Sequence, residues 1–315
     1  MRKAVVLSYF LITILFVPQG VVQEFVLNET GTCRTGPVHD LFVDSAYAYC
    51  SVDDGVAIID ISDKSDPRIV GKVETMDVTF GVFVQDGILY TVTQDGRLIV
   101  ASLHDPHQPV VLSSTPELKV PYKIRVIKDH AYISQSMGKM VIYDISAPAA
   151  PQWVSSLYLG RAGMGHALNN GILYVTVRSK GLFIFNVNTP KEPEFISEMP
   201  VKGNARSICI EDDLLFVGAY TGPVSIYSLA SPYEPRLLSK VNGHGDASDI
   251  CVRGNILTIA DLEKGLLVYD ISIPEFPKLM AEAETMSEEV FFDGEYVYVA
   301  GDGELRIFEI VTRDE

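Results

Sequence analysis

The chain has 315 residues, of which 41 are acidic and 25 are basic, and its formal net charge at pH 7 is −16. A surface this acidic repels phosphate backbones, so we do not expect nucleic acid among the partners of this protein. Four cysteines are too few in a chain of this length to form a disulfide scaffold.

The first twenty residues differ in composition from the rest of the chain. A basic start, MRK, precedes an apolar run, AVVLSYFLITILFV, that ends at Pro18. This is the form of a secretory signal peptide, because the run is too short to span a bilayer comfortably. We therefore expect residues 1–20 to be a signal peptide, with cleavage between residues 20 and 23. The mature chain is then secreted, periplasmic or at the cell surface, without a membrane span. An uncleaved membrane anchor is the alternative.

The remainder of the chain, residues 24–315, is built on one internal repeat. An aliphatic or aromatic residue closes a short apolar run, and in six of seven cases an aromatic follows six places later. This residue recurs every 40–42 positions, at 43, 84, 126, 168, 210, 252 and 292. Repeats of roughly 40–45 residues with four short strands each are the signature of propeller blades. We predict an all-β fold, a single seven-bladed β-propeller with four-stranded antiparallel blades whose first strands end near these positions.

A recurrent phrase, as in GLLVYDISIPEFPKL (265–279), marks the third strand of each unit and the loop after it. The strand is apolar on both faces, which predicts that another sheet covers each side. The Asp or Asn at its end, for example Asp144 or Asp270, can accept hydrogen bonds from nearby backbone N–H groups and begin a turn. Pro274 and Pro277 fix φ in that turn. A proline-rich ligand for another domain is the alternative, but the fixed place of the prolines in the repeat favours the turn.

The seventh unit ends too early to contain an outer strand. Only VTRDE follows its third strand, whereas EFVLNETG (24–31) matches the outer-strand text EFISEMPVKG (194–203). We therefore predict that residues 24–30 form the outer strand of blade 7. Such a strand closes the ring and leaves no pair of blade faces exposed.

The phrase GLLVYDISIPEFPKL resembles the LVIVD repeat, a propeller repeat of bacterial and archaeal exported or cell-surface proteins. The resemblance covers residues 24–315 in all seven units. Units 2 and 5 depart from it, with Ser102 and Ser228 where the Asp is expected. The resemblance implies a propeller and export, and it implies no catalytic residues.

Candidate ligand-binding residues cluster at the start of the first strands. The loops that enter these strands and those that join second to third strands are predicted at one face, around the mouth of the central channel. This place is concave and every blade contributes to it, so it is the usual position of a ligand. The candidates are His39, Asp40, Lys123, Arg206, Asp249, Glu288 and Glu289. The alternative is that these charges only solvate the pore.

Two residues break the pattern of the first strands. His166 stands where other units have Leu, Val or Ile, and Arg125 stands where others have Phe, Ala or Cys. Burying such groups is costly unless they are paired, so both are candidate site residues, catalysis included. A satisfied core histidine and a structural ion pair are the alternative.

The cysteines allow one predicted link. Cys33 and Cys50 are expected near the same face of the ring, and an exported chain meets oxidising conditions, so they are the candidate disulfide. Cys209 and Cys251 occupy equivalent places on adjacent blades and are interpreted as buried thiols.

We predict no metal site and no cofactor. His39, His166 and His244 lack the spacing of a zinc site. The acidic loops VDDG (52–55) and DGE (302–304) are interpreted first as turns, with calcium as the alternative.

These patterns favour an exported, non-enzymatic and monomeric scaffold that presents loops around the channel mouth to a protein, a glycan or a cell-surface component. The alternative is an extracellular hydrolase or lyase at the channel mouth, since catalytic groups in a propeller come from separate blades and leave no linear motif. Its candidate groups are His39, Arg125, His166 and Asp249. Convergence of these four side chains in a pocket favours the enzyme, and scattered or internally paired side chains favour the scaffold.

Overall fold

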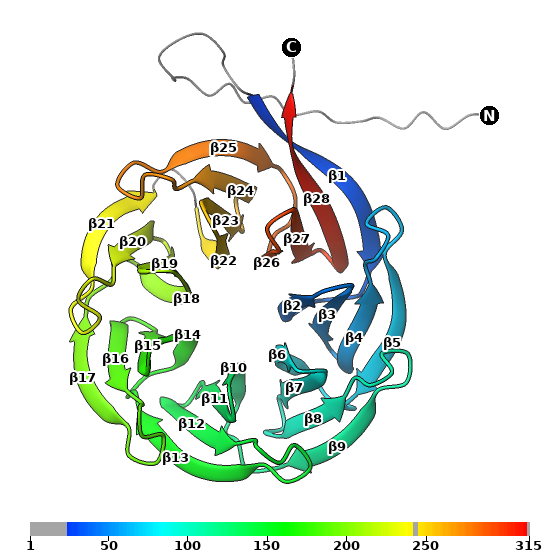
Figure 1. Cartoon of the computed structure of the whole chain (residues 1–315), viewed down its shortest axis with the longest axis vertical. Helices are drawn as coiled ribbons and strands as arrows, with labels where there is room; N and C mark the ends of the chain where they lie inside the picture. The colour runs from blue at the N-terminus through cyan, green and yellow to red at the C-terminus, as the bar shows by residue number, and fades with distance from the viewer. Residues whose placement is uncertain (1–23, 242–244, 314–315) are drawn as a thin grey trace.

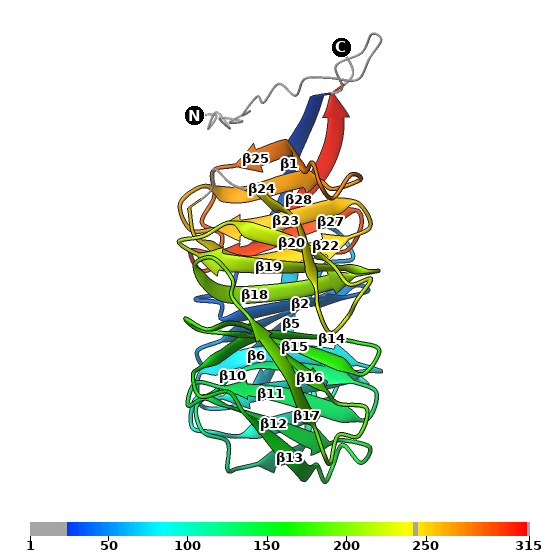
Figure 2. The ribbon, with the colours of Figure 1, turned by 90° about the vertical axis from the view of Figure 1, so that its left-hand side faces the viewer.

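Seven four-stranded antiparallel sheets are arranged around a central channel, so the predicted all-β, seven-bladed propeller is confirmed (Figure 1). The computed structural model describes residues 24–241 and 245–313, and the signal-peptide prediction and His244 lie outside these ranges. Seen from the side, the ring is a disc on edge, and the ends of β1 and β28 project from it (Figure 2). Within the described ranges, no helix is long and apolar enough to cross a membrane.

Each blade runs outward from the channel through four strands. The innermost strands are β2 (Asp40–Asp44), β6 (Thr79–Gln85), β10 (Pro121–Ile127), β14 (Gly163–Asn169), β18 (Asn204–Glu211), β22 (Ala247–Arg253) and β26 (Glu289–Phe292). The second strands are β3 (Tyr47–Val52), β7 (Ile88–Thr93), β11 (His130–Gln135), β15 (Ile172–Val177), β19 (Leu214–Tyr220), β23 (Ile256–Asp261) and β27 (Tyr296–Gly301). The third strands are β4 (Gly55–Asp60), β8 (Leu98–Ser102), β12 (Lys139–Asp144), β16 (Gly181–Asn186), β20 (Val224–Ser228), β24 (Gly265–Asp270) and β28 (Glu304–Arg313). The outer strands are β5 (Arg68–Glu74), β9 (Val110–Thr115), β13 (Gln152–Tyr158), β17 (Glu194–Met199), β21 (Arg236–Val241), β25 (Lys278–Ala283) and β1 (Glu24–Arg34).

The hydrophobic core consists of clusters between neighbouring blades. Tyr132 and Met140 of blade 3, for example, pack with Leu173 and Phe185 of blade 4. The third strands are apolar on both faces because each lies between two such clusters, and five of the six residues of β24 are buried. Apolar contact from both sides therefore buries the third strand of each blade.

The turn after the third strand forms in blades 1–6 as the sequence predicts. Four acceptors take a hydrogen bond from the backbone N–H two residues later at 2.8–3.1 Å, and these are Asp60, Asp144, Asn186 and Asp270. Where the repeat departs, the hydroxyls of Ser102 and Ser228 accept the same bond at 3.3 and 3.2 Å. A serine hydroxyl therefore replaces the carboxylate at the cost of a longer contact.

The proline-containing loops also fasten neighbouring blades together at the outside of the ring. The Ser155 hydroxyl in β13 donates to the backbone oxygen of Pro190 in the loop of the next blade, at 2.6 Å. Equivalent bonds join Ser113 to Pro148 and Ser239 to Pro274. Between blades 1 and 2 the equivalent position is Gly71, which lies against the Pro106 oxygen, and a Cβ atom there would be 2.1 Å from that oxygen. The repeated loop therefore forms a turn and also joins neighbouring blades. We call the bond from an outer-strand serine to the proline oxygen of the next blade the interblade clasp.

The N-terminal strand closes the last blade, as predicted. β1 is the outer strand of the sheet β1-β28-β27-β26 and runs antiparallel to β28, from Glu24 opposite Arg313 to Arg34 opposite Glu304. It is longer than the predicted 24–30, because β28 offers a partner over its whole length. Phe25 and Leu27 pack against a cluster that includes Met280 of blade 6, so β1 ties blade 7 to blade 6.

Candidate functional site

The seven innermost strands, with the residues just before β2 and β26, place equivalent residues in three tiers along the channel. The mouth tier consists of His39, Phe80, Tyr122, Met164, Arg206, Ser248 and Glu288. The charge tier, one residue further along the chain, consists of Asp40, Gly81, Lys123, Gly165, Ser207, Asp249 and Glu289. The inner tier, two residues beyond that, consists of Phe42, Phe83, Arg125, Ala167, Cys209, Cys251 and Phe291. The tiers differ from blade to blade, although the strands that carry them repeat.

Lys123 joins three blades through ion pairs in the charge tier. Its Nζ lies 2.5 Å from Asp40 Oδ1 and 2.8 Å from Glu289 Oε2. Asp40 and Glu289 are buried, at 1% and 3% exposure, and Asp40 also accepts the Val82 backbone N–H at 2.9 Å. Asp40 belongs to blade 1, Lys123 to blade 3 and Glu289 to blade 7, so the pairs bridge strands that are far apart in sequence.

One ammonium group faces three carboxylates in this tier. Burial lowers the pKa of Lys123, but Asp40, Glu289 and Asp249 outweigh burial and leave it raised, so Lys123 is charged at neutral pH. Burial raises the pKa of Glu289 well above its usual 4.5, with repulsion from Asp249 and Asp40 adding to the effect. Burial likewise raises the pKa of Asp249, whose Oδ2 accepts the Val290 N–H at 3.2 Å.

The mouth tier forms an arc of aromatic and cationic groups. The rings of His39 and Phe80 lie 5.5 Å apart, and Phe80 lies 6.4 Å from Tyr122. The Arg206 guanidinium lies 5.9 Å from the centroid of Tyr122 and 4.7 Å from that of Tyr220. These distances are those of ring pairs and cation–π contacts. We call these five residues the mouth arc.

The inner tier is filled unevenly. On one side Phe42 lies 4.7 Å from Phe83 and 5.6 Å from Phe291, and the Arg125 guanidinium lies 6.0 Å from Phe83. On the other side the tier has Ala167, Cys209 and Cys251, which are small. Large aromatic rings therefore close half of the channel, and the other half retains space.

A polar cavity of about 20 Å³ lies on the side of the small residues. Its lining consists of Tyr122, Lys123, Arg125, Gly165, His166, Arg206, Ser207, Ile208, Ser248 and Asp249. A Cβ at Gly165 would lie 2.7 Å from the Arg206 backbone oxygen, so only glycine allows strands β14 and β18 to approach this closely. The cavity holds one or two water-sized groups by the rule that a water needs about 10–15 Å³.

His166 is a buried, neutral side chain in this lining. It is 4% exposed, and its Nε2 lies 2.9 Å from the Tyr132 backbone oxygen, so Nε2 carries the proton and Nδ1 is an acceptor. Burial lowers the pKa of His166 to about 3, and the nearby Arg125 charge contributes. Within the described residues, neither His166 Nδ1 nor the buried Ser207 Oγ has a hydrogen-bond partner.

The structure brings most of the predicted site residues together and leaves two apart from them, His39 in the mouth arc and Glu288. Asp40, Lys123, Glu289, Arg125, His166, Arg206 and Asp249 meet in the channel. His39 instead lies 2.9 Å from Asp53 Oδ1, and Glu288 is exposed. Of the four residues proposed for an enzyme, Arg125, His166 and Asp249 line the cavity and His39 does not.

Sequence reasoning did not identify Phe80, Tyr122, Tyr220 and Ser207. Phe80 and Tyr122 occupy the same repeat position as His39 and Arg206, so comparison across the mouth tier could have found them. Tyr220 lies at the end of a second strand, and no repeat position pointed to it.

The structure has all four cysteines as free thiols, so it does not contain the predicted Cys33–Cys50 disulfide. Cys33 and Cys50 belong to the same apolar cluster, and burial raises the pKa of both thiols. Burial also raises the pKa of Cys209, and that of Cys251 to about 12, in keeping with their interpretation as buried thiols.

No group of three or more His, Cys, Asp or Glu in the described ranges is arranged to hold a metal ion. In the acidic loop 52–55, Asp53 pairs with His39 and Asp54 pairs with Lys72. In the loop 302–304, Glu304 contacts Arg34 and Arg306, at 3.6 and 3.1 Å. Asp54 and Glu304 thus make ion pairs within the protein, and Asp53 makes a hydrogen bond with His39.

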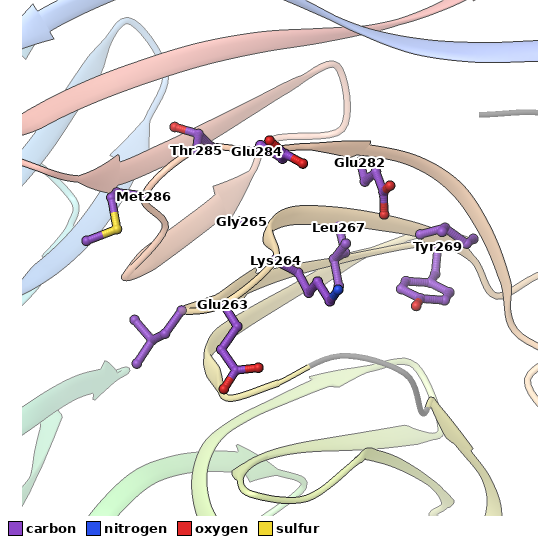
Figure 3. Close-up of a pocket in the computed structure, with 11 residues that line it drawn as sticks. Glu263, Lys264, Gly265, Leu267, Tyr269, Glu282, Glu284, Thr285 and Met286 are labelled. Carbon is purple, nitrogen blue, oxygen red and sulfur yellow. The ribbon is translucent and has the colours of Figure 1, made fainter. Parts of the chain in front are cut away.

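A larger hollow of about 440 Å³ lies on blade 6, away from the channel (Figure 3). Glu263 and Lys264 come from the turn before β24, Tyr269 from β24, and Glu282 and Glu284 from β25 and the loop after it. Figure 3 shows Glu282 and Tyr269 at one end of this hollow and Met286 at the other. None of the predicted site residues belongs to its lining.

Solved structures with this architecture include proteins of very different origin. The β-propeller domain of Myceliophteria thermophila Cps50 (Swd1) aligns with a TM-score of 0.76 at 13% identity, covering 90% of this chain and all of that domain. The computationally designed Ika8 protein (TM-score 0.67) and Saccharomyces cerevisiae Sqt1 (0.66) each share 12% identity over 91% of this chain, and 99% and 98% of their own chains are covered. At such low identity these likenesses describe the fold alone. No curated protein matches this chain in sequence.

The fold and the channel therefore define a seven-bladed β-propeller scaffold whose departures from symmetry lie at its axis. The family model of the LVIVD repeat matches residues 35–75, 122–158, 244–285 and 286–310. The chain therefore contains LVIVD repeats, as its repeated phrase indicated.

Proposed function

We propose that this protein is an exported, non-enzymatic binding scaffold that holds a protein, a glycan or another cell-surface component at the mouth of its channel. The observation that carries the proposal is the mouth arc. Tyr, Phe and Arg are the side chains that contribute most to binding at protein surfaces, and here they are held by their neighbours before any partner arrives. Rigid side chains lose little conformational entropy on binding.

Internal pairing of the channel charges favours this function over hydrolysis or elimination. Lys123 is occupied by Asp40 and Glu289, and His39 by Asp53. The Nε2 of His166 is occupied by the Tyr132 backbone oxygen, so the ring does not activate a nucleophile through that nitrogen. A cavity of about 20 Å³ also has no room for a reacting bond with its flanking groups.

Export rests on the N-terminal sequence, MRK followed by an apolar run up to Pro18. The mature N-terminus of the protein recovered from culture medium, periplasm or cell surface tests it. Mass spectrometry should find cleavage between residues 20 and 23, a few residues before β1. Recovery of the full-length chain in the cytoplasm would contradict export.

Binding at the mouth is tested with a matched pair of variants. Phe80→Ala removes a ring of the mouth arc, and Phe276→Ala removes a ring that is 71% exposed in the loop after a third strand, at the opposite face of the ring. Wild type and both variants are screened on arrays of glycans and of cell-surface proteins. We expect partners whose binding is lost in Phe80→Ala and kept in Phe276→Ala, with both variants retaining the wild-type melting temperature.

The enzyme alternative has its own test. Hydrolase and lyase substrate panels are applied to the wild type and to His166→Ala. An activity present in the wild type and absent in the variant, with the variant still folded, would replace the scaffold proposal.

A further inference from the structure

Arg206 is held in place by contacts that leave its terminal nitrogens free. Its Nε donates to the Ser248 backbone oxygen at 2.9 Å, and its guanidinium plane lies by the rings of Tyr220 and Tyr122. Within the described residues, no carboxylate forms an ion pair with it, and its terminal nitrogens donate no hydrogen bond. A fixed guanidinium with free donors has the geometry that binds planar oxyanions in a bidentate manner.

A second guanidinium reaches the same cavity and makes only a long ion pair there. Arg125 Nη1 lies 3.9 Å from Asp40 Oδ2, too far for a hydrogen bond, and it donates instead to the Ile124 backbone oxygen. Lys123 also lines the cavity, but Asp40 and Glu289 already neutralise it. The two arginines are therefore the cations of the lining that a ligand can still pair with.

The remaining polar groups of the lining complement a small acid. Ser207, which is 6% exposed, has a hydroxyl with no partner in the described structure. Asp249 brings one carboxylate, whose pKa is raised by burial and whose Oδ2 accepts a backbone N–H. The lining has three cations, Lys123, Arg125 and Arg206, and one carboxylate, Asp249; counted together with Asp40 and Glu289, which pair with Lys123, the charges balance.

We propose that this cavity is a binding site for the carboxylate group of a small organic acid, held between Arg206 and Arg125 with the Ser207 hydroxyl donating to it. The size of the cavity, about 20 Å³, suits the two oxygens of a carboxylate and requires the rest of the ligand to extend toward the mouth. The carboxylate belongs either to a free acid or to the C-terminus of a peptide.

Sodium acetate is the probe, with sodium chloride as the balance at constant ionic strength. A ligand that binds the folded state raises the melting temperature with its concentration. We expect a saturable rise with acetate above that with chloride, and a matching shift of the Arg206 Nε–H resonance in NMR spectra. Acetate that acts no differently from chloride overturns the proposal, and so does inorganic phosphate that binds as tightly as acetate.

Arg206→Lys keeps the charge and removes the fork, and Arg253→Lys makes the same change in an exposed residue at the far end of β22. We expect Arg206→Lys to weaken acetate binding by about 10- to 100-fold, from the loss of charge-assisted hydrogen bonds. Arg253→Lys should bind like the wild type. Arg125→Lys is the second variant, and it keeps the test decisive if Arg206→Lys is poorly folded in chloride. Equal acetate response in all three variants contradicts the site.

Triglycine with a free or an amidated C-terminus separates the two sources of the carboxylate. Competition by the free peptide alone assigns the site to a peptide terminus, and binding of acetate without peptide competition assigns it to a free acid. Phe80→Ala leaves Arg206 and Arg125 in place and should keep its acetate response, so the carboxylate site and the proposed mouth function can fail separately.

Discussion

The outside of the ring repeats from blade to blade, whereas the residues that line its channel differ. At the outside, the third strands of blades 1–6 end in the same turn, and serines or glycines at one repeat position meet the loop of the next blade. In the channel, equivalent positions hold residues as different as Gly165, Lys123 and Glu289. The repeated turns and interblade contacts at the outside hold the blades in place. The side chains of the innermost strands can therefore differ from blade to blade. We therefore expect the functional residues of such a ring at the channel positions that differ between blades.

Ring closure is the test of the outside with the largest expected effect. Deleting residues 24–28 removes Phe25 and Leu27 from their cluster and exposes the edge of β28. We expect a loss of about 5 kcal/mol in the free energy of unfolding, which lowers the melting temperature by about 10 °C or more. Calorimetry measures it.

A double variant on the same strand is the control for that deletion. Asn28→Ser with Glu29→Gln changes two exposed side chains of β1 and leaves its apolar contacts intact, so it should melt like the wild type. A deleted protein with the wild-type melting temperature would mean that β1 does not close the ring.

Removing the cation of the charge tier tests how much the channel contributes to stability. Lys123→Met leaves Asp40, Glu289 and Asp249 without their cation, and breaking a buried pair in this way costs about 3–5 kcal/mol. Urea unfolding at pH 7 measures the loss. Lys119→Met, the same change in an exposed residue just before β10, should lie within about 0.5 kcal/mol of the wild type.

The loss in Lys123→Met should shrink as the pH falls. The folded-state pKa of Glu289 is raised, so the folded chain takes up protons more readily than the unfolded chain, and stability is lost as pH rises through the folded-state pKa. Without Lys123 this pKa rises further, and acidification toward pH 4.5 should restore part of the stability. A loss that is equal at pH 7 and pH 5 would show that the three carboxylates do not repel one another.

The repeat explains why the sequence predicts the outside of the ring so much better than its channel. A period of 40–42 residues, third strands apolar on both faces and an early end to unit 7 determine the blades and their closure. The same period also identifies which residues share a tier. The period does not predict which side chains contact one another across the channel. Lys123, for example, contacts Asp40 and Glu289, which lie 83 and 166 residues away from it in the sequence. The contact of Arg206 with Tyr220, and the free state of Cys33, depend on side-chain packing that no repeat encodes.

His166 gives a pH test of intermediate size inside the channel. Its pKa is lowered from 6.5 to about 3 in the folded state, so its contribution to stability is present above pH 6.5 and is lost as the pH falls toward 3. At pH 4.5 this amounts to about 2–3 kcal/mol relative to pH 7.5. His166→Gln can still donate to the Tyr132 oxygen but does not titrate, so its stability should fall less over the same range. Parallel pH profiles of the two proteins would mean that His166 is charged when folded.

Removing one interblade clasp should have the smallest effect on the free energy of unfolding. The same contact occurs between several pairs of blades, so its effect can be measured more than once. Ser155→Ala removes the bond to the Pro190 oxygen, and one such hydrogen bond contributes about 1 kcal/mol. Ser156→Ala makes the same change one position along β13, where the side chain is exposed, and should be nearly neutral. Chemical unfolding resolves a difference of this size. If Ser239→Ala costs the same as Ser155→Ala and the two losses add, each clasp acts on its own pair of blades, as expected for bonds that lie two blades apart. Equal stability of Ser155→Ala and Ser156→Ala would instead assign all the cohesion of neighbouring blades to the apolar clusters between them.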